Sequence, residues 1–185
     1  MVLIDGKEVA VVNNSKDFSF DPMDSHFSSN ITWHILDVIV ENMGRPNVWG
    51  VIDSARRGIN GNVLFDGKTT SKYTIYSMEF KHKYVEQLKQ VKGRSVGKAN
   101  AGPSLFRAVL DIKDKPRDTF LRLDNWKKGN VFVNGFNIGR YYEIGPQKTL
   151  YIPAPLLKTG INDIYVFELH SGTDSIRFVD KPDLG

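Results

Sequence analysis

The sequence predicts an all-β fold made of two β-sandwich or jelly-roll units. Short runs rich in β-branched and aromatic residues recur along the chain, and turn-forming pairs separate them. The sharpest of these pairs are Asp5-Gly6, Asp66-Gly67 and Asn134-Gly135. Each pair accepts a positive φ at low cost and therefore suits a two-residue hairpin turn between strands.

Five strands are expected in the first unit, at residues 2–4, 8–12, 31–40, 61–65 and 73–80. Each is a run of apolar, β-branched or aromatic residues bounded by turn residues, which is typical of a short strand. The first two flank the Asp5-Gly6 pair, and the fourth ends at the Asp66-Gly67 pair, so both places are expected to form hairpins.

Six further strands are expected in the second unit, at residues 105–112, 119–123, 129–133, 149–152, 163–169 and 175–179. Residues 84–91 have helix-like apolar spacing and predict a single connecting helix or a solvated loop. Three glycines, a proline and almost no apolar side chain make residues 92–103 the expected linker. The sequence therefore predicts a partial first β-domain at residues 1–91 and a second β-domain, a jelly roll, at residues 104–185.

Composition excludes several classes of function. The net charge of +4 comes from 25 basic and 21 acidic residues spread along the chain, so no nucleic-acid-binding face is expected. Without cysteine, disulfides and thiolate metal sites are excluded. The apolar start at Val2 is interrupted at Asp5, so neither a signal peptide nor a membrane span is expected. The four histidines, His26, His34, His82 and His170, lack zinc-site spacing, and we expect no metal and no cofactor.

The most specific string in the chain is WKKGNVFVNGFNIGRYY, residues 126–142. It predicts a strand, an Asn-Gly turn and a return strand. Gly139, inside the return strand, is expected to mark a β-bulge or a close approach of two backbones.

This string and the segments IGPQKTLYIP (144–153), LLKTGIN (156–162) and IYVFEL (164–169) resemble the last jelly-roll domain of the β-galactosidases of glycoside hydrolase family 35. VIVENMGR (38–45), Asn47 and the Arg57-Gly58-Ile59 triplet resemble the preceding β-domain, and RFVDKP (177–182) resembles the closing segment. The resemblance covers nearly the full chain. It implies two units of the galactose-binding-domain-like type, the first one truncated and lacking the strands that normally come before it.

The resemblance implies that the catalytic residues are two glutamates on a (β/α)₈ barrel. Such a barrel takes roughly 250 residues and alternates strand with helix, whereas this chain has 185 residues and no such alternation. We therefore expect a non-catalytic region that braces the catalytic barrel of the same or a companion chain, and no glycosidase activity of the chain alone. Structural positions are expected for Glu41, Glu143 and Glu168. The animal members of the family imply a secreted or lysosomal location.

Two alternatives stay open: a free-standing carbohydrate-binding module, and an assembly domain without a ligand. Sugar recognition requires an aromatic face and polar groups for the hydroxyls. The candidate galactoside-binding residues are Trp49, Asn137, Arg140 and Tyr142. The residues expected to maintain the structure are Trp126, Asn134, Gly135 and Gly139. We expect Trp126 to be a core anchor and Arg140 to hold a buried or interdomain hydrogen-bonding position.

Overall fold

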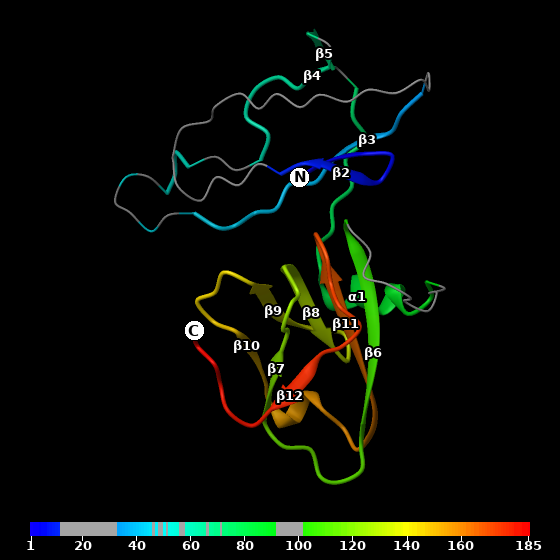
Figure 1. Cartoon of the computed structure of the whole chain (residues 1–185), viewed down its shortest axis with the longest axis vertical. Helices are drawn as coiled ribbons and strands as arrows, with labels where there is room; N and C mark the ends of the chain where they lie inside the picture. The colour runs from blue at the N-terminus through cyan, green and yellow to red at the C-terminus, as the bar shows by residue number, and fades with distance from the viewer. Residues whose placement is uncertain are drawn as a thin grey trace. The chain divides into compact units, whose positions relative to one another are not determined.

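Figure 1 shows the computed structural model of the chain. The structure describes residues 1–11, 33–45, 47, 50, 52–55, 58–65, 67–70, 72–91 and 102–185. The chain forms two compact units, Met1–Tyr76 and Ser77–Gly185. The described regular structure is almost entirely β, as the sequence predicts, and the two units are described separately below.

The first unit contains a small antiparallel sheet and a separate hairpin. Strands β1 (Val2–Ile4), β2 (Lys7–Ala10) and β3 (Leu36–Val38) pair in the order β2-β1-β3. Strands β4 (Leu64–Phe65) and β5 (Lys68–Thr69) form the hairpin. Asp5 and Gly6, with φ of 52° and 74°, make the turn between β1 and β2 that the sequence predicts.

The strand expected at residues 73–80 is not formed. Residues 72–80 have no regular secondary structure, because none of the described strands pairs with them. Ile75 and Tyr76 are 89% and 84% exposed, so their apolar side chains do not supply a buried sheet face either. An apolar alternation predicts a strand only where a neighbouring strand accepts its hydrogen bonds.

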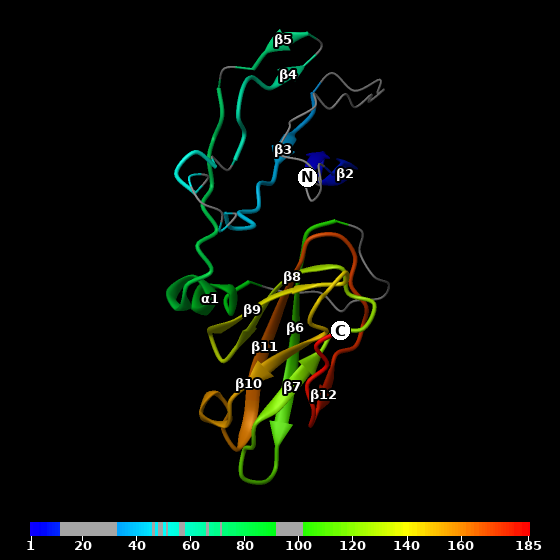
Figure 2. The same cartoon turned by 90° about the vertical axis from the view of Figure 1, so that its left-hand side faces the viewer.

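The second unit is a β-sandwich (Figures 1 and 2). One sheet has the order β6-β11-β8-β9, and the other has the order β10-β7-β12. The strands of the first sheet are β6 (Ser104–Ile112), β8 (Lys128–Val133), β9 (Phe136–Tyr142) and β11 (Gly160–Glu168). The strands of the second sheet are β7 (Thr119–Arg122), β10 (Thr149–Ile152) and β12 (Arg177–Val179). A 3₁₀ turn, η1 (Ala154–Leu156), follows β10.

The main core lies between these two sheets. Alternate residues of β8 and β11 point inward, so that Val131, Val133, Ile164 and Val166 pack against Leu121 of β7. All five side chains are at most 2% exposed. This packing explains why the apolar alternation of the second unit predicts its strands well.

A single short helix covers the other face of the four-stranded sheet. Helix α1 (His82–Leu88) places Val85 against Phe132 and Tyr165, in a cluster separate from the main core. Phe80 adds an edge-to-face contact with Phe132, with the ring centroids 5.3 Å apart. Residues 84–91 thus contribute a helix that packs on the second unit.

This packing moves the boundary between the units. The sequence places the end of the first domain at residue 91, whereas the compact units meet between Tyr76 and Ser77. The reason is that Phe80 and Val85 bury their side chains on β8. Of the predicted linker, residues 92–101 lie outside the described residues.

The β8–β9 hairpin has the geometry that its sequence predicts. Asn134 and Gly135 make the turn with φ of 49° and 86°. In β9, Gly139 pairs with Val131 while Asn137 pairs with Phe132, so Ile138 is an extra residue. This register shift is a β-bulge, and Gly139 adopts a φ of 130° that a side chain would disfavour.

Candidate functional site

Arg140 and Tyr142 lie on one face of β9, opposite Asn130 and Lys128 of β8. The Lys128 Nζ atom is 4.6 Å from the centroid of the Tyr142 ring, a cation–π contact that occupies this aromatic face. Arg140 is exposed. The Arg140 side chain is therefore not buried within the second unit, and an interdomain hydrogen-bonding position for it stays a prediction.

Asn137 is engaged in holding the bulge. Its Oδ1 atom accepts a hydrogen bond of 3.0 Å from the backbone N–H of Gly139. The fourth candidate, Trp49, lies outside the described residues. The structure thus brings Arg140 and Tyr142 together on one strand face, while the hydrogen bond of Asn137 to Gly139 is local.

Besides forming the turn, Asn134 links the hairpin to distant parts of the chain through its side-chain hydrogen bonds, which together are called the Asn134 clamp. Its amide donates hydrogen bonds to the carbonyl of Leu156 at 2.7 Å and to Oδ1 of Asn162 at 2.8 Å. Its own Oδ1 accepts from the backbone N–H of Asp163 at 3.0 Å. Asn162 is fully buried and donates in turn to the carbonyl of Lys158. The two asparagines join the hairpin turn to the start of β11.

Trp126 is 3% exposed and packs in the main core. Its ring meets Phe106 edge-on, with the centroids 4.8 Å apart. The indole N–H donates to the carbonyl of Ser175 at 2.9 Å, and Gly172 lies so close that a Cβ there would be 2.5 Å from the ring. The burial of Trp126 agrees with the prediction that this residue anchors the core, and it does not fit an exposed ring that binds a sugar.

Glu168 is a fully buried carboxylate whose partners surround it. It accepts hydrogen bonds from the backbone N–H groups of Lys127, Lys128 and His170 at 2.8–3.2 Å, and from the Tyr141 hydroxyl at 2.8 Å. Burial, together with the charge of Glu168, raises the pKa of Tyr141, which stays a neutral donor. This saturated carboxylate ties strand ends together and has no geometry for attack on a substrate.

Glu143 forms an ion pair. It is the other acidic residue of this unit for which the sequence predicts a structural position. The Lys127 Nζ atom lies 2.5 Å from its Oε2 atom on the surface. Among the described residues no group of three or more His, Asp or Glu side chains could hold a metal ion. No described helix is long and apolar enough to cross a membrane.

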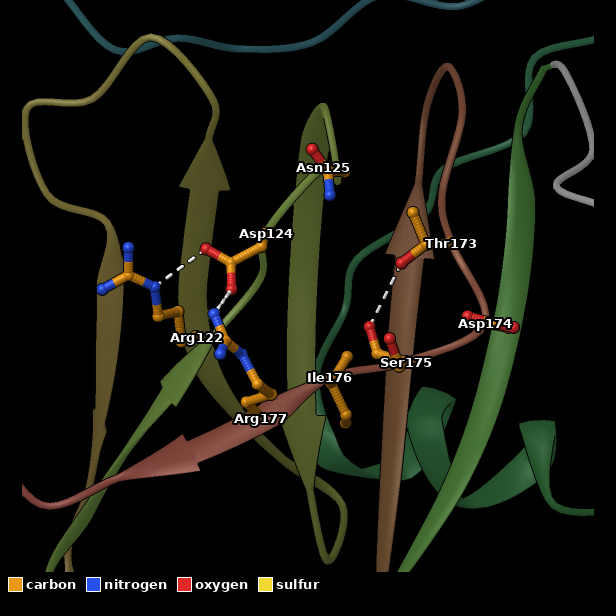
Figure 3. Close-up of a pocket in the computed structure, with 8 residues that line it drawn as sticks. All are labelled: Arg122, Asp124, Asn125, Thr173, Asp174, Ser175, Ile176 and Arg177. Atoms are coloured by element: carbon orange, nitrogen blue, oxygen red, sulfur yellow. Dashed lines mark hydrogen bonds and ion pairs between the residues drawn. The ribbon is translucent and has the colours of Figure 1, made fainter.

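A polar hollow of about 320 Å³ opens at one end of the sandwich (Figure 3). It lies between the residues that follow β7 and those that lead into β12. The lining residues are Arg122, Asp124, Asn125, Thr173, Asp174, Ser175, Ile176 and Arg177. Two arginines balance two aspartates, and Ile176 is the one apolar side chain in this lining. Sequence reasoning missed this site.

A charged network forms the wall of this hollow. Asp124 Oδ1 accepts from Arg122 Nε at 2.8 Å, and Oδ2 of the same carboxylate pairs with Nη2 of Arg177 (Figure 3). Arg122 also donates from Nη1 to Asp183 at 2.9 Å. The hydrogen bonds from Arg122 and then Arg177 lower the pKa of Asp124, so the carboxylate is ionised at neutral pH.

The pairing of β7 with β12 assembles this network. Arg122 and Arg177 occupy directly opposed positions of the two antiparallel strands. Like charges directly opposite each other destabilise a strand pair, and Asp124, two residues beyond Arg122, lies between the guanidinium groups and compensates for this repulsion. The signal in the sequence is the spacing of Arg122 and Asp124, but their partner is distant along the chain.

Two family models match the chain. Residues 1–79 match the first all-beta domain of beta-galactosidase, and residues 103–162 match the galactose-binding domain of beta-galactosidase. Together with the two all-β units, these matches define a class: the non-catalytic β-domains of glycoside hydrolases.

Similar proteins agree with the family models. The chain is 40% identical over 151 residues to human beta-galactosidase-1-like protein 2, covering 82% of the chain and 24% of that protein. It is 37% identical over 185 residues to human beta-galactosidase-1-like protein 3, covering 99% of the chain and 27% of that protein. Bovine beta-galactosidase is 33% identical over 171 residues, covering 80% of the chain and 26% of that protein.

The chain spans about a quarter of the length of the relatives it matches. It belongs to the β-galactosidase family, glycoside hydrolase family 35, and forms a non-catalytic β-domain region of that family.

Proposed function

We propose that the chain braces the catalytic barrel of a β-galactosidase, in the same or a companion polypeptide. The observation that carries this proposal is the exposure of large apolar side chains in the first unit. Trp33, Ile75 and Tyr76 are 85%, 89% and 84% exposed, whereas the buried apolar side chains described in this unit are Leu3 and Ile4. Exposed apolar surface of this kind is typical of a protein interface.

The energetics favour burial of these side chains against a partner. Removing a large apolar side chain from water stabilises an assembly by roughly 1.5–3 kcal/mol. Aromatic residues such as Trp33 and Tyr76 are enriched among the residues that dominate binding energy. A neighbouring domain that covers them adds to the small core that the described residues of the first unit form.

The test is association with a separately expressed partner. We would mix the purified chain with the part of human beta-galactosidase-1-like protein 2 that it does not match and measure the affinity by calorimetry. We expect a complex, which a Trp33→Ala or Tyr76→Ala substitution weakens about tenfold or more. The matched control is Ile144→Ala, which truncates an apolar side chain 66% exposed on the second unit.

Two results would contradict the bracing proposal. One is the absence of any complex at high concentrations of both proteins. The other is equal weakening by the control and by the first-unit variants. The proposal also implies that the complete protein hydrolyses terminal β-galactosides, whereas the isolated chain releases no galactose from a nitrophenyl β-galactoside.

A second candidate function is the binding of galactosides by the second unit. The name of the matched family model, a galactose-binding domain, and the polar hollow beside Trp126 support it. Hydroxyl groups of a sugar require neighbouring donors and acceptors, and the hollow supplies both. Titration of the chain with galactose and lactose tests this function, and the absence of binding at saturating sugar would exclude it.

A further inference from the structure

We infer that the hollow formed by Arg122, Asp124 and Arg177 is the site at which the second unit recognises the hydroxyl groups of a neutral pyranoside. This inference rests on the second proposed function, galactoside binding, and assigns it to a different surface from the one the sequence predicts. The residues after β7 and before β12 contribute the polar groups, not those of β9.

The polar groups of the hollow are fixed before any ligand binds. Both oxygens of Asp124 are held by guanidinium groups, and Asp183 holds Arg122 from its other side. The opposite wall is anchored to the core, because Trp126 donates to the carbonyl of Ser175. A site whose side chains are ordered before binding loses less conformational entropy when the ligand arrives.

The charged side chains that line the hollow balance one another. The lining has two positive and two negative side chains and so no formal net charge. An anion would need an excess of positive groups, and a metal ion would need more carboxylates than this network leaves unpaired. A neutral ligand that both donates and accepts hydrogen bonds fits this lining, and vicinal sugar hydroxyls have that property.

The opposed arginines carry an energetic cost. Pairing β7 with β12 does not require an arginine at both opposed positions, and the two like charges repel each other unless a carboxylate lies between them. The result is a set of guanidinium N–H groups beside an aspartate at the rim of a cavity of about 320 Å³. That volume is at the lower end of the range of small-molecule sites and suits one or two sugar rings.

The contacts that the hollow offers a sugar are mostly polar. Among the described residues no aromatic side chain lines it, and Ile176 is the one apolar side chain in this lining that can contact a face of a sugar ring. Recognition therefore depends on hydrogen bonds that compete with water, each of modest net strength. We expect weak, millimolar binding with dependence on the orientation of the hydroxyls.

The experiment follows the backbone amide signals of the full chain by NMR during titration with galactose, lactose and, separately, sodium sulfate. We expect both sugars to shift the signals of residues 122–125 and 173–177, and sulfate to leave them unchanged. Arg177→Gln and Asp124→Asn should weaken sugar binding about tenfold or more, a loss typical of a charged hydrogen-bond partner.

Two matched controls localise the effect. Arg107→Gln removes another exposed arginine, one paired with Asp163 on β6 and β11, outside the hollow. Arg140→Gln removes the arginine of the β9 surface that the sequence favours. Both controls should bind sugar as the unaltered chain does, and thermal denaturation of every variant shows that it is folded.

The possible results distinguish the location and ligand class of the site from galactoside binding itself. Loss of binding in Arg140→Gln but not in Arg177→Gln or Asp124→Asn would overturn the location and leave galactoside binding intact. Shifts of the same signals by sulfate, stronger than those by sugar, would make the hollow an anion site and overturn the ligand class. No response of the unaltered chain to either sugar would refute both.

Discussion

Asp124 connects the hollow to stability as well as to binding. Its carboxylate accepts hydrogen bonds from two arginines, and these lower its pKa in the folded chain below the usual value of 3.8. Because the pKa is lower in the folded chain, the ionised carboxylate contributes its full stabilisation at pH values above the pKa of the unfolded chain. This contribution is lost as the pH falls through the lower pKa of the folded chain. The network therefore weakens in acid rather than in base.

We predict that Asp124→Asn lowers the free energy of unfolding at pH 7 by about 1 kcal/mol, since the groups are partly exposed. The difference from the unaltered chain should shrink as the pH falls below about 4 and close only below the lowered pKa of the folded chain, where the carboxylate is protonated in both states. Urea denaturation of both chains at a series of pH values measures this difference in the free energy of unfolding. Asp174→Asn is the control, because Asp174 lines the same hollow without an ion pair to any described residue. A difference that persists unchanged below pH 3 would contradict the assignment.

Trp126 anchors one wall of the hollow through its hydrogen bond to the carbonyl of Ser175. Because it is buried and its indole N–H has a backbone partner, Trp126→Ala should lower the free energy of unfolding by about 3–5 kcal/mol. Thermal denaturation measures the loss. Trp33→Ala, which removes an indole that is 85% exposed, should change the melting temperature little. Equal effects of the two substitutions would show that Trp126 does not anchor the core.

At the scale of single residues, the sequence predicts those features that depend only on residues adjacent along the chain. The Asn134-Gly135 turn and the bulge at Gly139 are local, and both are found. The hollow is not local, because Arg122 meets Arg177 only through the pairing of β7 with β12. The exposure of Arg140 depends on which face of β9 points outward, and a bulge makes that face difficult to infer from alternation.

At the scale of elements, helix α1 is held to the β8–β9 hairpin by contacts to the turn itself. His82 Nδ1 and the carbonyl of Gly135 are 3.1 Å apart. A Cβ atom at Gly135 would lie 2.7 Å from both the His82 ring and the Glu86 carboxylate. The turn glycine therefore serves two purposes: it permits the positive φ, and it leaves room for the helix.

Gly135→Ala should destabilise the chain more than Gly160→Ala does. Both glycines have nearly the same positive φ, 86° and 88°, but a Cβ at Gly160 meets nothing within 4 Å. Each substitution incurs a backbone cost of about 1–2 kcal/mol, and displacement of His82 and Glu86 should add about 1 kcal/mol or more at Gly135. Chemical denaturation compares the two. If the two variants were equally stable, the helix would not depend on this close approach.

Among the elements, the strands of the second unit could be predicted and the strand at residues 73–80 could not. In the second unit, alternation coincides with a second sheet that buries the inward side chains of β8 and β11. Residues 73–80 are also rich in β-branched and aromatic residues but have no described partner strand, and Phe80 instead packs on Phe132. Pairing is a property of two segments, so one segment alone does not specify it.

At the scale of the whole molecule, the two units differ in how much core they contain. The second unit buries two clusters, one between its sheets and one under α1. In the described part of the first unit the buried apolar side chains are Leu3 and Ile4. Stability grows with the apolar area removed from water, so the second unit should dominate cooperative unfolding.

We predict that residues 77–185, produced alone, unfold in one cooperative transition close to the main transition of the full chain. Differential scanning calorimetry measures both, and the first unit should contribute little heat. A shift of the main transition by more than about 10 °C, which for a domain of this size corresponds to about 2 kcal/mol or more, would show that the second unit depends on the first. Production of residues 1–76 alone provides the complementary sample.

The Asn134 clamp also affects how the protein ages chemically. An asparagine followed by glycine is prone to spontaneous deamidation, because the backbone nitrogen of the glycine can attack the side-chain amide. Here that amide donates to Leu156 and Asn162, so the folded chain keeps it away from the reactive geometry. Unfolding removes this protection. An aspartate formed at this position would place its carboxylate against two oxygen acceptors when the chain refolds. Heat damage at this single bond should therefore accumulate only in unfolded molecules and should hinder their return to the native state.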